Sequence, residues 1–320
     1  MRQAGVLDVG CHSALLTVVR WRAGAVLEPV FSHKVRLRLH ETLDRKGRLG
    51  KAGVKSVQRA VAEAITAHPH PHLRLPEVFA FATSVIRDAP NREEVIARVA
   101  RTTGTWLRVL PGEEEARLAY VAARQWTDCA VGPLLVLDIG GGTVEIASGT
   151  DAQPRVVRSL PLGARRITRD WLPGGIASSG RRLAEVRRHL RHCLSREPGV
   201  PRAAQGERVL ACSKTFEQLA RFAGAAHGEP RRTGRQLTLP QLRGATRLLA
   251  DVAPDRRGAL PGISRHRAEQ SLAGALIAES LMEACGVSSV EICPWSTREG
   301  LLLERLGVLD DASRHDRPPG

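Results

Sequence analysis

The stretch Leu134-Leu135-Val136-Leu137-Asp138-Ile139-Gly140-Gly141-Gly142-Thr143 decides the fold of this 320-residue chain. Its apolar half predicts a buried strand, and the aspartate and glycines predict a tight turn where the strand ends. Consecutive glycines let successive backbone N–H groups approach an anion, and the hydroxyl of Thr143 adds a donor. An aspartate in this position can hold a metal ion. Taken alone, the stretch fits a plain glycine-rich hairpin turn equally well. It contains neither a Walker A loop nor a dinucleotide-binding fingerprint.

The same pattern opens the chain. Asp8-Val9-Gly10 ends a short apolar stretch 130 residues before Asp138-Ile139-Gly140, and strand-like residues follow both turns. Strands and helices mixed in two similar halves indicate a duplicated α/β fold with a cleft between the copies.

Hydrophobic periodicity gives the remaining elements. We expect strands at residues 14–21, 25–31, 34–39, 78–82, 106–110, 143–147, 156–160, 209–212 and 290–293. We expect helices at residues 54–67, 113–125, 181–194, 215–222, 268–284 and 298–306, and one more that Asn91 caps. Residues 225–237 are expected to be an exposed loop.

The charge favours polyanionic partners. The formal net charge is +15, with 48 lysines and arginines against 33 acidic residues. Such an excess suits nucleic acid, phosphorylated metabolites, polyphosphate or anionic lipid. Compositional drift toward arginine in a GC-rich genome explains much of it equally well, so charge alone names no substrate.

The cysteines and the apolar runs bear on location. None of the six cysteines has CxxC or zinc-site spacing, which favours reduced thiols in a cytoplasmic protein. We find no signal-peptide pattern and no apolar run long enough to span a membrane, so we expect no membrane partner.

Two further segments carry candidate functional residues. Glu113-Glu114-Glu115 opens a helix, where acidic residues favour the helix dipole, or where one carboxylate positions a water for attack on phosphorus. Arg87 follows the strand at 78–82, where it is either a surface residue or a clamp for phosphate.

Six segments in order resemble the exopolyphosphatase/guanosine pentaphosphate phosphohydrolase (Ppx/GppA) family of the actin-like ATPase superfold. They are the first phosphate loop at 8–13, the Ala-Thr-x-x-x-Arg-x-Ala-x-Asn segment at 82–91, the Gly-x-Glu-Glu-Ala-Arg-Leu segment at 112–118, the second phosphate loop at 138–145, and later motifs at 159–163 and 295–300. The resemblance covers residues 4–306.

The resemblance implies an α/β fold of two ribonuclease-H-like domains with an interdomain phosphate-binding cleft, in a short two-domain form. We expect an N-terminal domain at 1–125, completed by a C-terminal helix at 298–308, a second domain at 126–297, and a disordered tail at 309–320. The resemblance also makes a homodimer plausible, although the sequence shows no interface.

The resemblance implies roles for individual residues and a Mg²⁺ cofactor. The catalytic glutamate falls on Glu115. The metal-binding carboxylates fall on Asp138, Glu145 and Asp8. Phosphate-binding residues fall on Gly10, Cys11, His12, Ser13, Arg87, Gly140, Gly141, Gly142 and Thr143.

The chain departs from the family pattern at three places. Cys11 and His12 replace the usual Ser-Asn of the first loop, and a thiol is a poor hydrogen-bond donor. Leu15 stands where the family often has Arg or His. Ser213-Lys214-Thr215 replaces a Ser-Gly-Thr loop, and Lys214 can supply charge where glycine would give backbone access.

These residues predict a hydrolase that releases terminal orthophosphate from inorganic polyphosphate by Mg²⁺-assisted attack of water. One alternative is hydrolysis of the 5′ phosphate of guanosine pentaphosphate. A third possibility is a weakly active regulatory protein that binds polyphosphate or an alarmone, because of the changes at Cys11, His12 and Leu15. We expect no specific binding of nucleic acid.

Overall fold

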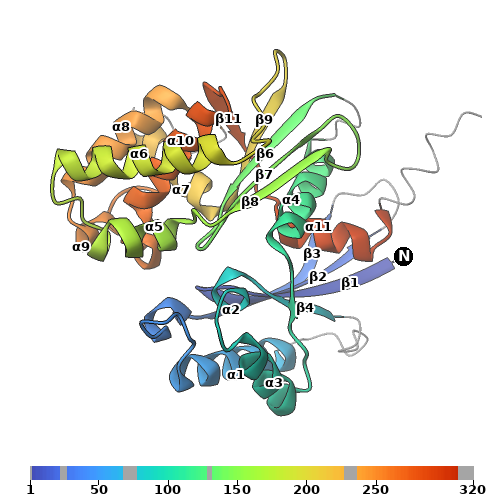
Figure 1. Ribbon diagram of the computed structural model, residues 1–320. Coiled ribbons are helices and arrows are strands. Elements are labelled where there is room, and N and C mark those ends of the chain that lie inside the picture. The colour runs from blue at the N-terminus through green and yellow to red at the C-terminus, as the bar shows by residue number, and fades with distance from the viewer. Residues whose placement is uncertain (1, 22–26, 68–77, 128–131, 227–235, 309–320) are drawn as a thin grey trace, which may run out of the picture. The chain divides into compact units, whose positions relative to one another are not determined.

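The computed structural model describes residues 2–21, 27–67, 78–127, 132–226 and 236–308. The chain divides into two compact units (Figure 1). Unit 1 comprises Met1–Pro111 with Arg298–Gly320, and unit 2 comprises Gly112–Thr297. The domain limits expected from the sequence, 1–125 and 126–297, stay a prediction. The expected disordered tail lies outside the described residues.

Unit 1 is built on a five-stranded sheet in the order β3-β2-β1-β4-β5. The strands are β1 (Arg2–Val9), β2 (Ser13–Trp21), β3 (Glu28–Arg36), β4 (Val78–Ala82) and β5 (Arg108–Val109). The first three are antiparallel neighbours, and β4 and β5 run parallel to β1. Val6, Leu7 and Val9 of β1 are fully buried, as expected for a central strand.

One strand replaces two that we expected. The sequence suggested separate strands at 25–31 and 34–39, but β3 runs unbroken through Glu28–Arg36. His33 stays in the ladder opposite Leu16, so the polar residues interrupt only the side-chain pattern and not the backbone pairing. Residues 25 and 26 lie outside the described part of the chain.

Helices cover the unit 1 sheet (Figure 1). They are α1 (Lys51–Thr66), α2 (Ser84–Arg87), α3 (Arg92–Thr103) and α11 (Thr297–Arg305), with a short 3-10 turn, η1, at Leu39–Thr42. Asn91 occupies the N-cap position of α3 without making the expected side-chain cap. Its amide instead bonds the backbone N–H and carbonyl of Leu49, at 2.9 and 3.0 Å.

Unit 2 repeats the same topology. Its sheet has the order β10-β11-β9-β6-β7-β8. The strands are β6 (Leu134–Ile139), β7 (Val144–Gly149), β8 (Val156–Leu160), β9 (Arg208–Cys212), β10 (Gln236–Thr238) and β11 (Ser289–Ile292). From β8 to β11 this order matches β3 to β5 of unit 1, with the same strand directions and with β10 added at the edge. The duplicated α/β fold predicted from the sequence is confirmed.

Helices cover both faces of the unit 2 sheet. Figure 1 shows α4 on one face and most of the other helices on the opposite face. The helices are α4 (Gly112–Trp126), α5 (Ala164–Trp171), α6 (Gly180–Arg196), α7 (Ser213–Ala226), α8 (Leu239–Asp251), α9 (Pro254–Arg257) and α10 (Ser271–Ala284). None of the helices in the described residues is long and apolar enough to cross a membrane.

Strand β6 shows how the two faces are used. Leu134 and Val136 pack with Ala116 and Tyr120 of α4. Leu135, Leu137 and Ile139 belong to the core on the opposite face. Because side chains alternate along a strand, Asp138 lies on the α4 face.

The prediction of an exposed loop at 225–237 was wrong at both ends. Residues 225–226 belong to α7, and Gln236–Thr238 forms β10, where Leu237 is fully buried opposite Val290. Residues 227–235 lie outside the described part of the chain. Thr238 and Gln241 then make a capping box that starts α8, a helix that we did not expect.

Candidate functional site: a glycine turn and three carboxylates in unit 2

The turn between β6 and β7 presents a row of backbone N–H groups. The N–H of Gly140 closes the turn on the carbonyl of Thr143 at 2.9 Å. The carbonyls of residues 140–142 accept hydrogen bonds of 2.9–3.1 Å from N–H groups of residues 163–165, at the start of α5. In a planar trans peptide the N–H points opposite to the carbonyl. The N–H groups of residues 141–143 are therefore directed away from α5, as an anion-binding turn requires.

Gly163 holds this turn in place. A Cβ atom at this position would lie 2.4 Å from both the carbonyl carbon of Gly142 and the nitrogen of Thr143. Only glycine lets the start of α5 approach the turn so closely. This contact explains why the segment at 159–163 ends in a glycine.

Three carboxylates gather on the α4 face of the sheet. Asp138 and Glu145 are directly opposite each other in the β6–β7 ladder. Glu115 lies in the first turn of α4, which packs on that face. Glu145 is 5% exposed and Glu115 is 7% exposed. The hydroxyl of Ser159 donates a 2.9 Å hydrogen bond to Glu145.

The structure distinguishes the three consecutive glutamates of α4. Glu113 is exposed. Glu114 forms an ion pair with Arg117 at 2.6 Å. Only Glu115 is buried. It is therefore the member of the trio that lies beside Glu145, whose pKa it raises.

Burial and mutual repulsion destabilise the ionised forms of these carboxylates. Burial raises the pKa of Glu145 well above its ordinary value, and the charges of Glu115 and Asp138 raise it further. Burial also raises the pKa of Asp138, although a 2.6 Å hydrogen bond from Ser296 and the charge of Arg267 oppose the shift. Bringing a cation close to these carboxylates would relieve their repulsion.

The residues fit a site of the open kind for a divalent metal ion. Mg²⁺ usually keeps several waters and is held by one or two carboxylates together with substrate phosphates. Asp138 and Glu145 can supply those two carboxylates. Within the described residues, the one group of three ligand side chains whose ligand atoms all lie within 4.8 Å of one another is elsewhere, in unit 1.

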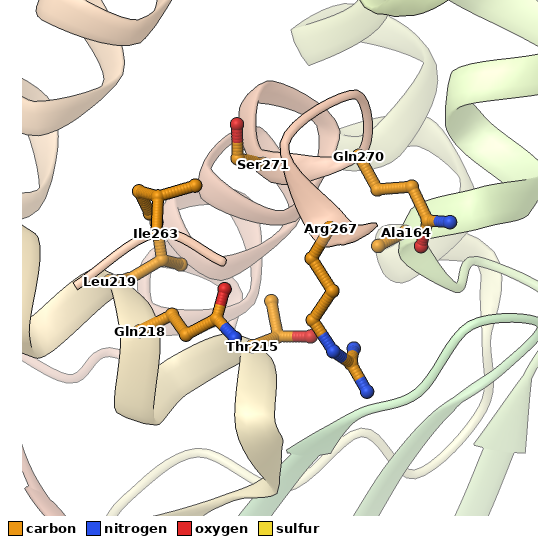
Figure 2. A pocket seen from close by; sticks show the side chains of 8 residues that line it. All are labelled: Ala164, Thr215, Gln218, Leu219, Ile263, Arg267, Gln270 and Ser271. Atoms are coloured by element: carbon orange, nitrogen blue, oxygen red, sulfur yellow. The ribbon is translucent and has the colours of Figure 1, made fainter. Parts of the chain in front are cut away.

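A small pocket adjoins the turn (Figure 2). Thr215, on its wall, donates a 2.9 Å hydrogen bond to the carbonyl of Ile139, just before the turn. The lining is mixed: Figure 2 shows the side chains of Arg267, Gln218 and Gln270 among apolar ones. The full lining is Ala164, Thr215, Gln218, Leu219, Ile263, Arg267, Gln270 and Ser271.

The Ser213-Lys214-Thr215 segment follows β9. Among the described residues other than glycine, Ser213 is the one with a positive φ, 82°. Such a conformation costs of order 1–3 kcal/mol and is often kept at functional turns. The ammonium of Lys214 pairs with Glu217, so part of the charge that we expected it to supply is already neutralised.

The first-loop residues lie together in unit 1. The N–H of Gly10 closes the β1–β2 turn on the carbonyl of Ser13 at 2.8 Å. The carbonyls of Cys11 and His12 accept hydrogen bonds from residues 39 and 37, at 3.0 and 2.8 Å. By the same peptide geometry, the N–H groups of His12 and Ser13 point away from that segment.

Asp8 is a half-buried acid at this turn. Its Oδ1 atom is buried and accepts no hydrogen bond within the described part of the chain. Burial raises its pKa to about 6, and the charge of Arg298 opposes the shift. A buried oxygen of this kind fits a cation ligand.

Arg87 is anchored within unit 1. Its guanidinium donates to the carbonyl of Leu110 and to the carboxylate of Asp88, both at 3.2 Å. Its phosphate-binding role stays a prediction.

Sequence reasoning missed three residues of the unit 2 site. It gave no role to Ser159 and Ser296, although both lie in segments that resemble the family. Nothing in the sequence pointed to Arg267.

Comparisons with known proteins identify relatives of this chain. Residues 17–308 match the Ppx/GppA phosphatase family. The chain is 41% identical over 309 residues to exopolyphosphatase 1 of Mycobacterium tuberculosis, covering 94% of this chain and 88% of that protein. It is 26% identical to a guanosine-5'-triphosphate,3'-diphosphate pyrophosphatase of Aeromonas hydrophila, covering 97% of this chain and 61% of that one.

Solved structures share the fold. An exopolyphosphatase from Cytophaga hutchinsonii superposes with a TM-score of 0.80 at 19% identity, over 97% of this chain and 98% of that one. The Ppx/GppA family member of Aquifex aeolicus gives a TM-score of 0.77 at 22% identity, over 99% of both chains.

Proposed function

The chain belongs to the Ppx/GppA phosphatase family, and we propose that it releases terminal orthophosphate from inorganic polyphosphate. The observation that carries this proposal is the gathering of Asp138 with the buried Glu115 and Glu145 on one face of the unit 2 sheet, beside a turn of directed N–H groups. The relatives at about 41% identity, named exopolyphosphatase 1, support polyphosphate as the substrate.

In the proposed mechanism Glu115 positions a water molecule and accepts its proton. The water oxygen forms a bond to the terminal phosphorus while the bond from that phosphorus to the bridging oxygen breaks. The shortened chain leaves with that oxygen. The N–H groups of residues 141–143 hold the phosphate oxygens in place for in-line attack.

Asp138 and Glu145 would hold the Mg²⁺ ion. When bound, this ion supplies charge that stabilises the phosphate oxygens as the transition state forms. Ser296 and Ser159 orient the two carboxylates by hydrogen bonds to Asp138 and Glu145, respectively.

Unit 1 contributes residues with parallel roles. The N–H groups of the turn at 10–13, with the side chains of Cys11, His12 and Ser13, are proposed to bind phosphate, as is Arg87. Asp8 is proposed as a further metal ligand, because its buried Oδ1 accepts no hydrogen bond within the described residues.

A second candidate substrate is guanosine pentaphosphate. The pocket beside the turn, with the polar side chains of Arg267 and Gln270 among apolar groups, favours it because a nucleoside needs such a mixed surface (Figure 2). The Aeromonas relative, named for a guanosine substrate, points the same way.

The test is phosphate release by the purified protein from each substrate, with Mg²⁺ and with EDTA. We expect Mg²⁺-dependent release, with a kcat/KM for long polyphosphate at least about tenfold above that for guanosine pentaphosphate. The reverse ratio would favour the second candidate. Binding without release from either substrate would favour a regulatory protein.

Salt dependence tests for an extended polyanion. Lys34, Arg36 and Arg38 are exposed along and just after β3 and offer a basic track. The KM for long polyphosphate should rise steeply with KCl, and that for a short chain less steeply, by analogy with counterion release from nucleic acid. Equal slopes for both chain lengths would contradict such a track.

We further propose a cytoplasmic location. Within the described residues no cysteine is in a disulfide, which is the usual state in a reducing compartment.

A further inference from the structure

Three metal-ligating side chains meet at the turn of unit 1. The ligand atoms of Cys11, His12 and His40 all lie within 4.8 Å of one another. The sulfur of Cys11 is 3.5 Å from Nδ1 of His40, and the rings of His12 and His40 meet edge to face with centroids 5.1 Å apart. His40 comes from η1, well away in sequence, and nothing in the family pattern predicted its presence here.

The backbone holds the three residues in position. The hydrogen bonds from Leu37 to His12 and from Leu39 to Cys11 fasten the segment before His40 to the turn. Thr42 closes η1 with a 2.8 Å bond to the carbonyl of Leu39, and its own carbonyl accepts from Gly50 at the start of α1. The two halves of the cluster are therefore fixed to each other by main-chain bonds.

The donor set selects a class of metal. Thiolate and imidazole ligands suit Zn²⁺ and similar transition metals, whereas Mg²⁺ prefers oxygen. With metal–sulfur and metal–nitrogen bonds of about 2.3 and 2.1 Å, a tetrahedral site separates the two atoms by about 3.6 Å. The separation of Cys11 and His40 is 3.5 Å, so this pair already has the required spacing. The ligand atom of His12 lies within 4.8 Å of the other two, so a movement of up to about 1.2 Å brings it to the same spacing.

Glu41 supports one tautomer of His40. Its carboxylate lies 3.9 Å from Nε2 of His40, on the side of the ring away from the sulfur. A carboxylate there favours a proton on Nε2 and leaves the Nδ1 lone pair for a metal.

We propose that Cys11, His12 and His40 form a binding site for a transition-metal ion of the Zn²⁺ class. Its fourth position would take water or a phosphate oxygen, since three protein ligands leave a tetrahedral ion one open place. The site is separate from the carboxylates of unit 2 in its residues and in its metal preference. A metal here would make phosphate binding by the first loop dependent on transition-metal supply.

Co²⁺ tests the site because it reports its own ligands by absorption. The full chain, freed of metal by a chelator and kept reduced, is titrated with Co²⁺ in a large excess of Mg²⁺. We expect one equivalent to bind, with the intense visible bands of tetrahedral Co²⁺ and a near-ultraviolet band from thiolate to cobalt. Zn²⁺ should displace it.

Three variants locate the signal. Cys11→Ser should abolish the thiolate band, and His40→Ala should weaken Co²⁺ binding at least about tenfold. The matched control is Cys193→Ser in α6. The sulfur of Cys193 lies 3.7 and 3.8 Å from the ring nitrogens of His189, a Cys–His pair that belongs to no three-ligand group within the described residues. It should leave the spectrum unchanged.

Two results would overturn the proposal: no Co²⁺ uptake in excess Mg²⁺, or a thiolate band that survives in Cys11→Ser. Circular dichroism checks that each variant is folded. Assayed with Mg²⁺ after transition metals are removed, His40→Ala should release phosphate at the wild-type rate, because the site is then empty in both proteins. A failure of this site is thereby distinguished from a failure of the proposed hydrolase function.

Discussion

The turns of β1–β2 and β6–β7 share a backbone and differ in side chains. Each follows a strand that ends in Asp-x-Gly, and each closes with a glycine N–H bonded to a carbonyl three residues on, at 2.8 and 2.9 Å. In each, a later segment binds the turn's carbonyls and so directs its N–H groups the other way. The side chains differ at the turn itself: unit 1 has Cys11 and His12, whereas unit 2 has two glycines.

The ladder partners of the two aspartates also differ. Asp8 pairs with Leu15, while Asp138 pairs with Glu145. The backbone geometry of the turn is therefore duplicated, and both turns can bind an anion. The metal-binding side chains are not duplicated, because of the two turns only that of unit 2 has a pair of facing carboxylates. We infer that unit 2 carries the chemistry.

The largest expected effect is at Glu115. Glu115→Gln keeps the shape and removes the base, so kcat should fall roughly 10²–10⁴-fold. The control is Glu113→Gln, which alters an exposed neighbour in the same helical turn and should change kcat less than about twofold. Steady-state phosphate release checks both. Wild-type turnover in a folded Glu115→Gln protein would remove the assigned role.

Gly163 tests the fixed backbone of the unit 2 turn. Gly163→Ala places a methyl group 2.4 Å from the turn's backbone, which must then move. Displacing the N–H groups should lower kcat/KM roughly 10–100-fold. Gly180→Ala, where a Cβ atom meets nothing within 4 Å, is the matched control. Equal kinetics in the two variants would show that the turn does not depend on this contact.

Asp8 gives a pH-dependent test of stability in unit 1. Its pKa is raised from 3.8 to about 6, so the folded state favours the protonated form. The cost of ionising it appears as the pH rises from about 4 to about 6 and is complete above that. In EDTA, Asp8→Asn should therefore be more stable than wild type at pH 8, by up to about 3 kcal/mol, with little difference at pH 4.

Thermal unfolding at both pH values measures this gain. Asp251→Asn, at an exposed aspartate, is the control and should change the free energy of unfolding by less than about 0.5 kcal/mol. A destabilised Asp8→Asn protein at pH 8 would mean that the carboxylate is held favourably in the folded state.

The smallest effect is at Cys11. Cys11→Ser restores a good hydroxyl donor beside the first loop, worth about 0.5–1.5 kcal/mol. With transition metals removed, kcat/KM for polyphosphate should rise several-fold, and any inactivation by peroxide should disappear. Unchanged kinetics and an unchanged peroxide response would assign Cys11 no part in phosphate binding.

Much of this molecule could be predicted from its sequence. The repeat of Asp-x-Gly after an apolar strand predicted the duplication, because strand period and glycine turns are local signals. The choice of Glu115 among three glutamates rested on family resemblance, and the structure adds its burial. His40 and Arg267 could not be predicted, since only the tertiary fold brings them to the turns. Helix α5 was also missed, because only a few of its mostly polar residues are buried.

The most direct test compares the two equivalent ladder positions. Glu145→Gln and Leu15→Gln place the same side chain opposite Asp138 and Asp8, and initial rates of phosphate release from polyphosphate are measured at saturating Mg²⁺. We predict that Glu145→Gln lowers kcat/KM roughly 10²-fold, the scale of losing one electrostatic element of an active site, while Leu15→Gln stays within about fivefold of wild type. Equal losses in both variants, or a fully active Glu145→Gln protein, would contradict the account.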